Sequence, residues 1–395
     1  MHQQLAILAV FVFLYSLVAG RVGRSMLSGP IIFVAAGFLL GPMVLGWFPG
    51  DESRETLRTL ADLTLALFLF IDAANANLKT LKRKAGIPAR MLLIGLPAAI
   101  ALGSGLALVM FDVLTVFEAA ILGTMLAATD AALGKAVVTN EAVPDRLREG
   151  LNVESGLNDG LCVPILFVFI ALQASGGAAE EGLVVKLLLE ELGIGALVGV
   201  FVAGAGVWLF DRFRRMGWMD LIWSQVTTMA MAIGCFAIAQ SLHGSGYIAA
   251  FVGGLVFGYL AKDETHHLVQ SAEGIAELLA LLTWFLFGYA IIGQIFGLFT
   301  WQVVVYALLS LTVVRMLPVF LSLTGSGESV ASRLFLGWFG PRGLASIVFA
   351  IIVLDEGLPG ARFMALVVMC TVFFSLVLHG VTANPLASKI AEREK

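Results

Sequence analysis

The sequence is poor in charge and in cysteine. Charged residues make up 13% of its 395 residues and apolar residues 59%, whereas an ordinary soluble domain carries about 25% charged residues. This composition excludes a soluble enzyme or binding domain, and nucleic acid is not an expected partner. The three cysteines, Cys162, Cys235 and Cys370, lie far apart without metal-ligand spacing, so we interpret them as packing residues and expect no cofactor.

Long apolar runs are abundant instead. They fall at 5–20, 29–47, 59–77, 88–110, 115–139, 148–173, 182–210, 219–241, 245–261, 268–295, 300–322, 331–354 and 361–385. Most approach the roughly 20 residues that a helix needs to cross the hydrocarbon of a bilayer. We therefore predict an all-α polytopic membrane protein, embedded in the lipid bilayer, with about 13 transmembrane helices.

The basic residues between these runs segregate onto one side of the predicted membrane. Seventeen lie in one set of alternating loops and four, Arg54, Arg58, Lys186 and Arg362, in the other. Because basic loops stay in the cytoplasm, we place the N-terminus outside and the C-terminus in the cytoplasm, with a short tail at 386–395. The first run lacks a basic region ahead of it, so we interpret it as a retained helix rather than a cleaved signal.

The glycine pattern suggests an internal repeat. Ser28-Gly29-Pro30-Ile31, which leads to Gly37 and Gly41, aligns at an offset of 217 with Ser245-Gly246-Tyr247-Ile248, which leads to Gly254 and Gly258. The offset pairs spans seven helices apart, and seven is odd, so the two copies have opposite orientations. Inverted repeats of this kind are typical of secondary transporters.

Several charged residues fall inside the apolar runs. The acids are Asp72, Asp130, Glu154 and Asp159, and the bases are Lys135, Arg315 and Arg342. A charge near the bilayer centre costs roughly 3 kcal/mol, so such residues are usually functional or paired. We expect Arg315 to snorkel to the cytoplasmic surface. Arg342 follows Gly340 and Pro341, which can open its helix.

Helical geometry divides the polar residues of the sixth span between two faces. Ser155 and Asp159 share one face, and Glu154 and Asn158 share another. We predict that Glu154 forms a permanent ion bridge with Arg342. On the other face, Asp159 and Ser155 are expected to share a polar cavity with Thr129 and Asp130, whose oxygen ligands suit a hard cation.

Three stretches together resemble the monovalent cation:proton antiporter superfamily, and more closely its NhaP-type sodium/proton exchanger branch. They are Ala128-Thr129-Asp130, Glu154-Ser155-Gly156-Leu157-Asn158-Asp159-Gly160 and Gly340-Pro341-Arg342-Gly343. The resemblance implies crossed, discontinuous fifth and twelfth spans and a homodimer. It also implies a core domain (88–173 and 300–385) that moves against dimerisation helices (1–77), with a linker and further dimerisation helices at 182–295.

The resemblance also implies roles for individual residues. Asp159 would carry the ion or the proton, with Thr129, Asp130 and Ser155 around it as ligands of a transported Na⁺, and Glu154 bridged to Arg342. Asn158 and Asp72 are counted with them as ion- or proton-binding residues. Members with Asn-Asp, as at Asn158-Asp159, generally exchange one cation for one proton without net charge. The implied activity is electroneutral exchange of Na⁺, or alternatively Li⁺ or K⁺, for H⁺ across a plasma or bacterial inner membrane, and not an enzymatic reaction.

Some residues depart from this pattern or leave alternatives open. Ala131 stands where many relatives have proline after the span-five aspartate, and Lys135 lies one turn beyond Asp130. Asp72 could line the cation path or end its helix near the basic cytoplasmic loop. An intramembrane aspartyl protease is disfavoured because its Gly-x-Gly-Asp motif is absent. A sodium-coupled organic solute symporter remains the alternative function.

Overall fold

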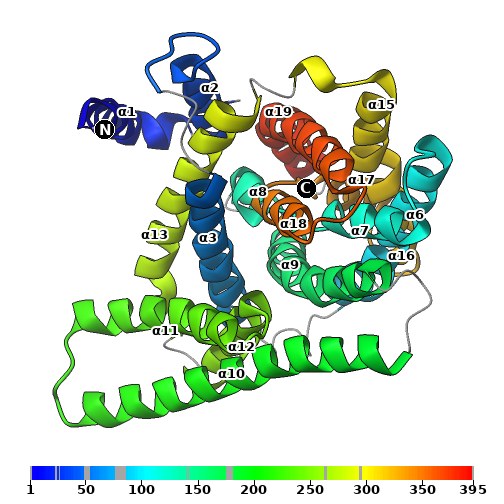
Figure 1. Ribbon diagram of the computed structural model, residues 1–395. Coiled ribbons are helices and arrows are strands. Elements are labelled where there is room, and N and C mark those ends of the chain that lie inside the picture. Colours follow the sequence, from blue (N-terminus) through cyan, green and yellow to red (C-terminus); the bar gives the residue numbers. More distant parts are fainter. Residues whose placement is uncertain are drawn as a thin grey trace.

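A computed structural model of the chain is almost entirely helical (Figure 1). It describes residues 2–22, 25, 27–48, 54–75, 86–138, 140, 142–174, 181–261, 265–292 and 296–393, and these contain no strand. The first half contains α1 (His2–Val22), α2 (Gly29–Leu40), α3 (Arg54–Asn75), α5 (Gly86–Arg90), η1 (Met91–Gly95), α6 (Leu96–Met110), α7 (Val116–Met125), α8 (Ala131–Val138), α9 (Asp145–Ala174) and α10 (Glu181–Arg215).

The second half continues in the same way. It contains α11 (Leu221–Ser241), α12 (Gly246–Ala261), α13 (Thr265–Leu286), η3 (Phe287–Ile292), η4 (Phe296–Leu298), α15 (Trp301–Leu309), η5 (Ser310–Val314), α16 (Arg315–Ser322), α17 (Val330–Trp338), α18 (Leu344–Asp355) and α19 (Ala361–Arg393). Turns η1, η3 and η5 are π-helical and continue the helices beside them.

These elements group into thirteen segments within the described ranges, one for each predicted span. Seven helices are long and apolar enough to cross a membrane individually, so the chain is an integral membrane protein. The fifth span is divided into α7 and α8, and the twelfth into α17 and α18. Helix α19 runs on to Arg393, so 386–393 extends the last helix rather than forming the separate tail that we predicted. Pro385 lies inside that helix without ending it.

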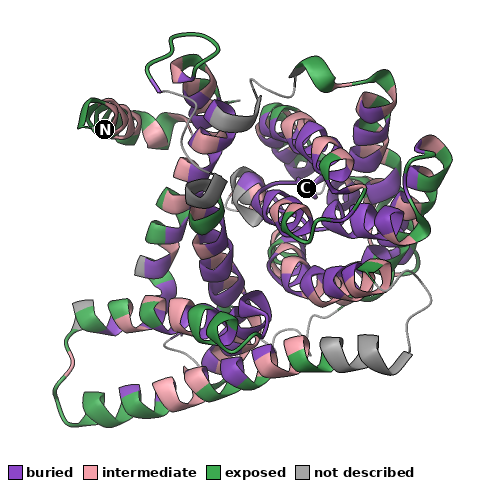
Figure 2. Ribbon diagram, in the orientation of Figure 1, coloured by how far each residue is buried: buried purple, intermediate pink, exposed green. Residues whose placement is uncertain are grey.

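The helices form two bundles (Figure 1). In one, α12 packs on α3, α10 and α11, and α13 packs on α2 and α3; in the other, α7 packs on α6 and α9, and α19 on α15 and α18. The bundles meet where α3 contacts α9 and α18 and where α12 contacts α9. Exposed residues gather on α1 and along α10 and α11 (Figure 2). Many are large and apolar, such as Phe13, Leu17 and Phe201, as expected of surfaces that face lipid.

The aligned glycines allow close contact between two helix backbones in each repeat. A Cβ on Gly37 of α2 would lie 2.0 Å from the carbonyl oxygen of Phe285 in α13. A Cβ on Gly254 of α12 would lie 2.2 Å from the carbonyl oxygen of Phe70 in α3. Both positions therefore require glycine because two helix backbones touch there. The contact between α2 and α13 is thus the repeat of the contact between α12 and α3, which confirms the inverted repeat.

Side-chain contacts between helix ends agree with the count of spans. Arg58, near the start of α3, lies 2.5 Å from Asp355 at the end of α18. Thirteen alternating spans place these two helix ends on the same side of the membrane. Glu118, at the start of α7, likewise accepts a 2.7 Å hydrogen bond from the backbone of Gly360, between α18 and α19.

The glycine contacts yield a stability prediction. Gly254→Ala should lower the free energy of unfolding by roughly 1–3 kcal/mol, because the added methyl group overlaps the α3 backbone. Gly204→Ala on α10 is the matched control, since its Cβ would meet nothing within 4 Å. Thermal melting of the purified protein in detergent measures both. Equal melting temperatures for the two variants would contradict the close packing of α12 on α3.

Candidate functional site

The two broken spans cross one another at their breaks, as predicted. The backbone N–H of Asp130, in the first break, donates a 2.7 Å hydrogen bond to the carbonyl oxygen of Pro341 in the second. Helix α7 ends at Met125 and α8 begins at Ala131, so the fifth span breaks although it has no proline after Asp130. Four helix ends therefore meet inside the protein.

Asp130 binds the two helix N-termini at this crossing. Its Oδ1 accepts a 3.1 Å hydrogen bond from the backbone N–H of Leu133 in α8. Its Oδ2 accepts a 2.9 Å hydrogen bond from the backbone N–H of Leu344, the first residue of α18. A carboxylate suits this position because helix N-termini carry unsatisfied N–H groups and partial positive charge.

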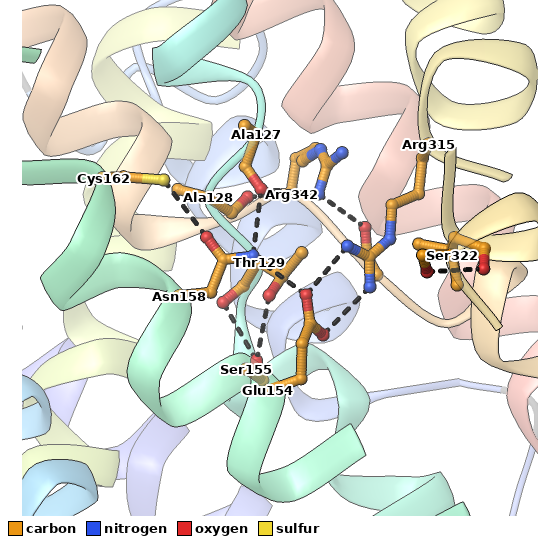
Figure 3. A network of polar contacts seen from close by, with 12 residues as sticks. Ala127, Ala128, Thr129, Glu154, Ser155, Asn158, Cys162, Arg315, Ser322 and Arg342 are labelled. Atoms are coloured by element: carbon orange, nitrogen blue, oxygen red, sulfur yellow. Dashed lines mark hydrogen bonds and ion pairs between the residues drawn. The ribbon is translucent and has the colours of Figure 1, made fainter. Parts of the chain in front are cut away.

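Arg342 binds carbonyl groups at the C-terminal ends of the other two helices, α7 and α17. Its Nη1 lies 3.3 Å from the carbonyl oxygens of both Ala127 and Ala128, beyond the end of α7, and 3.1 Å from that of Gly340, beyond the end of α17 (Figure 3). The side chain is fully buried. A cation stabilises helix C-termini because their free carbonyl groups carry partial negative charge.

The predicted bridge between Glu154 and Arg342 is wrong. Glu154 instead forms a bidentate ion pair with Arg315, at 2.8 and 2.9 Å (Figure 3). Both side chains of this pair are 1% exposed, so the prediction that Arg315 snorkels to the surface is also wrong. The physical reason is geometric, because Arg342 Nη1 points toward the backbone carbonyls of the breaks and Arg315 is the base whose guanidinium reaches Glu154.

Asn158 belongs to this ion-pair network. Its Nδ2 donates to Glu154 Oε1 at 3.0 Å and to the carbonyl oxygen of Ala127 at 3.3 Å, and its Oδ1 accepts from the thiol of Cys162 at 3.1 Å. The predicted face shared by Glu154 and Asn158 is therefore confirmed. However, the predicted role of Asn158 as an ion ligand does not fit, because its amide is turned toward Glu154 and engaged there.

Asp159, Ser155 and Thr129 lie together on the other face of α9. The hydroxyl of Ser155 donates a 3.0 Å hydrogen bond to the carbonyl oxygen of Thr129, and the Thr129 hydroxyl lies 3.4 Å from Ser155 Oγ. The backbone of Thr129 also lies close to the Asp159 carboxylate. Among the described residues, the buried Oδ1 of Asp159 has no hydrogen-bond partner. The structure thus brings these three predicted residues together.

Two further carboxylates lie within electrostatic range of Asp159, namely Asp130 and Asp72. Asp72 comes from α3 and packs against α9, where its Cβ would lie 3.0 Å from a Cβ added to Gly156. Asp72 therefore faces the site from the neighbouring bundle. The side chain of Lys135 lies outside the described residues. Carboxylate, hydroxyl and carbonyl oxygens gathered in this way can hold a hard cation or a proton.

Sequence reasoning missed two polar residues at the second break, Ser375 and His379 of α19. The Ser375 hydroxyl accepts a 2.6 Å hydrogen bond from the backbone N–H of Arg342, and the His379 ring reaches the carbonyl oxygen of Trp338. Their spacing of four residues in an apolar helix was the available signal, because it places both on one face.

The ion pair yields a prediction about coupling. Arg315→Leu should destabilise the protein by about 3–5 kcal/mol, because Glu154 then stays buried and charged without its partner. In double-mutant cycles, Glu154→Gln should couple strongly with Arg315→Leu and weakly with Arg342→Leu, as measured by melting in detergent. Additive effects of the Glu154 and Arg315 substitutions would contradict the pairing.

Comparison with known proteins identifies the family of the chain. Residues 7–389 match the family model described as "Sodium/hydrogen exchanger, transmembrane". The chain is 24% identical over 374 residues to the K(+)/H(+) antiporter NhaP of Alkalimonas amylolytica, covering 94% of this chain and 63% of the relative. It is 30% identical over 277 residues to the Na(+)/H(+) antiporter NhaH of Halobacillus dabanensis, covering 67% of each.

The fold is similar to that of the sodium proton antiporter MjNhaP1 from Methanocaldococcus jannaschii at pH 8. That match has a TM-score of 0.76 at 23% identity and covers 99% of this chain and 100% of the other. The chain thus has the fold of MjNhaP1, while it spans less than two thirds of the length of the NhaP relative. Because the family model matches nearly its whole length, the chain belongs to the sodium/hydrogen exchanger family of membrane transporters.

Proposed function

We propose that the protein exchanges a monovalent cation for a proton across the membrane, with Asp159 as the carrier of both. The observation that carries this proposal is the buried Oδ1 of Asp159, which has no hydrogen-bond partner in the described part of the chain. By contrast, both oxygens of Asp130 accept backbone hydrogen bonds. A buried carboxylate oxygen without a donor is poorly stabilised as a bare anion, so a cation or a proton is favoured there.

The neighbours of Asp159 supply the rest of a cation site. Thr129 and Ser155 contribute neutral oxygens, and Asp72 contributes a second carboxylate from α3. Asp130 adds negative charge from the crossing, although it acts first as a cap for α8 and α18. When a proton binds Asp159, the site loses the charge that attracted the cation, so the two ligands compete.

The same arrangement supports exchange of one cation for one proton. Glu154 and Arg315 neutralise one another, and two helix N-termini stabilise the charge of Asp130. Asp159 is then the group that changes its occupant. Because Na⁺ and H⁺ carry the same charge, the loaded site crosses the membrane with the same net charge in both directions, and transport is electroneutral.

The proposed cation is Na⁺, with K⁺ and Li⁺ as alternatives. Oxygen ligands suit all three, and the relatives include one named for K⁺ and one named for Na⁺. Transport would proceed by alternating access. The bundle that carries α7, α9, α18 and α19 would move as a core against a dimerisation bundle that contains α3 and α12 in a homodimer.

The proposed setting is a plasma membrane, or the inner membrane of a bacterium, in which the protein serves pH homeostasis. The N-terminus would lie outside and the C-terminus in the cytoplasm, because the basic loops segregate to that side. The shared side of Arg58 and Asp355 supports the alternation of spans on which this orientation depends.

Asp159→Asn tests the carrier. In proteoliposomes that contain a pH-sensitive dye, this variant should abolish cation-driven proton movement while the protein still folds, because an amide binds neither ligand in the same way. Asp145→Asn is the matched control, since it makes the same change at a 76% exposed side chain of the same helix. Exchange by Asp159→Asn at the rate of the control would remove Asp159 from this role.

The cation and the stoichiometry are tested in the same vesicles. Na⁺, K⁺ and Li⁺ are added in turn across a preset pH gradient while the membrane potential is clamped at several values. We expect at least one cation to dissipate the gradient at a rate independent of the potential. Failure of all three would refute antiport, whereas a rate that changes steeply with potential would refute one-for-one exchange.

A further inference from the structure

The second break is tied to α19 by a closed set of buried hydrogen bonds. The Arg342 backbone N–H donates to Ser375 Oγ at 2.6 Å, and Ser375 Oγ lies 3.1 Å from His379 Nδ1. On its other side, His379 Nε2 lies 2.9 Å from the carbonyl oxygen of Trp338, the last residue of α17. Ser375 and His379 are 0% and 1% exposed.

Both ring nitrogens of His379 lie near a carbonyl oxygen, because Nδ1 is also 3.1 Å from the backbone carbonyl of Ser375 in its own helix. A neutral ring carries one hydrogen. In the tautomer with that hydrogen on Nε2, the ring donates to Trp338 across to α17, and Nδ1 accepts from the Ser375 hydroxyl. The chain of bonds runs from the Arg342 amide through Ser375 and His379 to the Trp338 carbonyl, and so spans residues 338–342 of the break.

At the offset found for the glycines, these two residues align in sequence with Asn158 and Cys162. The offset of 217 that aligns Gly37 with Gly254 also carries 158 to 375 and 162 to 379. Each pair lies on the helix that follows a broken span. Asn158 holds the first break through the carbonyl oxygen of Ala127, and Cys162 donates to Asn158, just as His379 and Ser375 hold the second.

The remaining site positions differ between the repeats. At the same offset, Glu154 corresponds to Thr371, Ser155 to Val372 and Asp159 to Leu376. The second repeat therefore has none of the charged residues of α9 at these positions. It retains polar side chains where they brace the break. At this alignment, α19 has the polar residues that contact a break but not the residues that are proposed to bind the ion.

We propose that Ser375 and His379 are positioning residues that hold the second break in the geometry of the ion site. The position of the second break affects Asp130, which is hydrogen-bonded to it twice. The Asp130 carboxylate accepts from the backbone N–H of Leu344, and the Asp130 backbone N–H donates to the carbonyl oxygen of Pro341. Thr129, the neighbour of Asp130, contacts Ser155 and Asp159. We call the hydrogen bonds of Ser375 and His379 to the second break the brace. The effect of the brace on the ion site rests on the proposed function, whereas the brace itself does not.

Hydrogen–deuterium exchange of the full-length protein in nanodiscs tests the brace without transport. Ser375→Ala and His379→Ala should speed exchange in peptides that cover 338–344 by about fivefold, the effect of losing a single hydrogen bond. His379→Gln should restore slow exchange, because its amide can still donate to Trp338. Thr371→Ala is the matched control, since its buried hydroxyl bonds the carbonyl oxygen of Val367 within the same helix.

Transport by the same variants tests positioning. His379→Ala should raise the KM for the cation severalfold with a smaller change in maximal rate, and His379→Gln should lie near the wild type. Unchanged exchange at 338–344 in both alanine variants would overturn the brace. Faster exchange with an unchanged KM would overturn the positioning role. A wild-type protein that exchanges no cation would instead refute the proposed function. Deuterium exchange at 338–344 would still show whether Ser375 and His379 hold the second break.

Discussion

Four helix ends meet in the membrane interior, and their backbone groups have to be satisfied where water is scarce. Asp130 accepts from the N-termini of α8 and α18, and Arg342 donates to carbonyl groups that follow α7 and α17. Without these two side chains the crossing would bury several unpaired N–H and C=O groups, each costing several kcal/mol in hydrocarbon. The site is built around this crossing, so its geometry depends on that neutralisation.

The neutralisation also decides how the other charges are distributed. Arg342 Nη1 points toward the carbonyl groups of the crossing, and a different base, the buried Arg315, pairs with Glu154. This pair is neutral and held by two hydrogen bonds, as a buried ion pair must be if it is to offset its desolvation. Asp159 is left with an oxygen that no donor of the described residues reaches. The proposed carrier therefore differs from the other buried acids in lacking a donor at this oxygen.

The sequence predicted the parts of this structure that follow from periodicity. Hydropathy and charge segregation were sufficient for thirteen spans, the glycine offset for the inverted repeat, and the helical spacing of Ser155 and Asp159 for their common face. The sequence could not predict which side chains pair across the bundle. The choice between Arg315 and Arg342 depends on backbone carbonyls at the crossing, and no one-dimensional pattern records which carbonyls a break leaves free. The burial of Arg315 could not be predicted either. A π-helical turn directly precedes this residue, and a one-dimensional pattern does not show such a turn.

The position of Asn158 gives a physical reason why this residue would influence stoichiometry without binding the cation. Its amide hydrogens point at two acceptors, Glu154 Oε1 and the carbonyl oxygen of Ala127. An ionised carboxylate in its place would have no hydrogen to donate and would face both acceptors with lone pairs. It would need a proton of its own to remain in that network, so an aspartate at 158 would add a second titrating group beside the carrier. The amide meets the same hydrogen-bonding demand permanently, so under the proposed function Asp159 would exchange one proton for one cation without a second titrating group beside it.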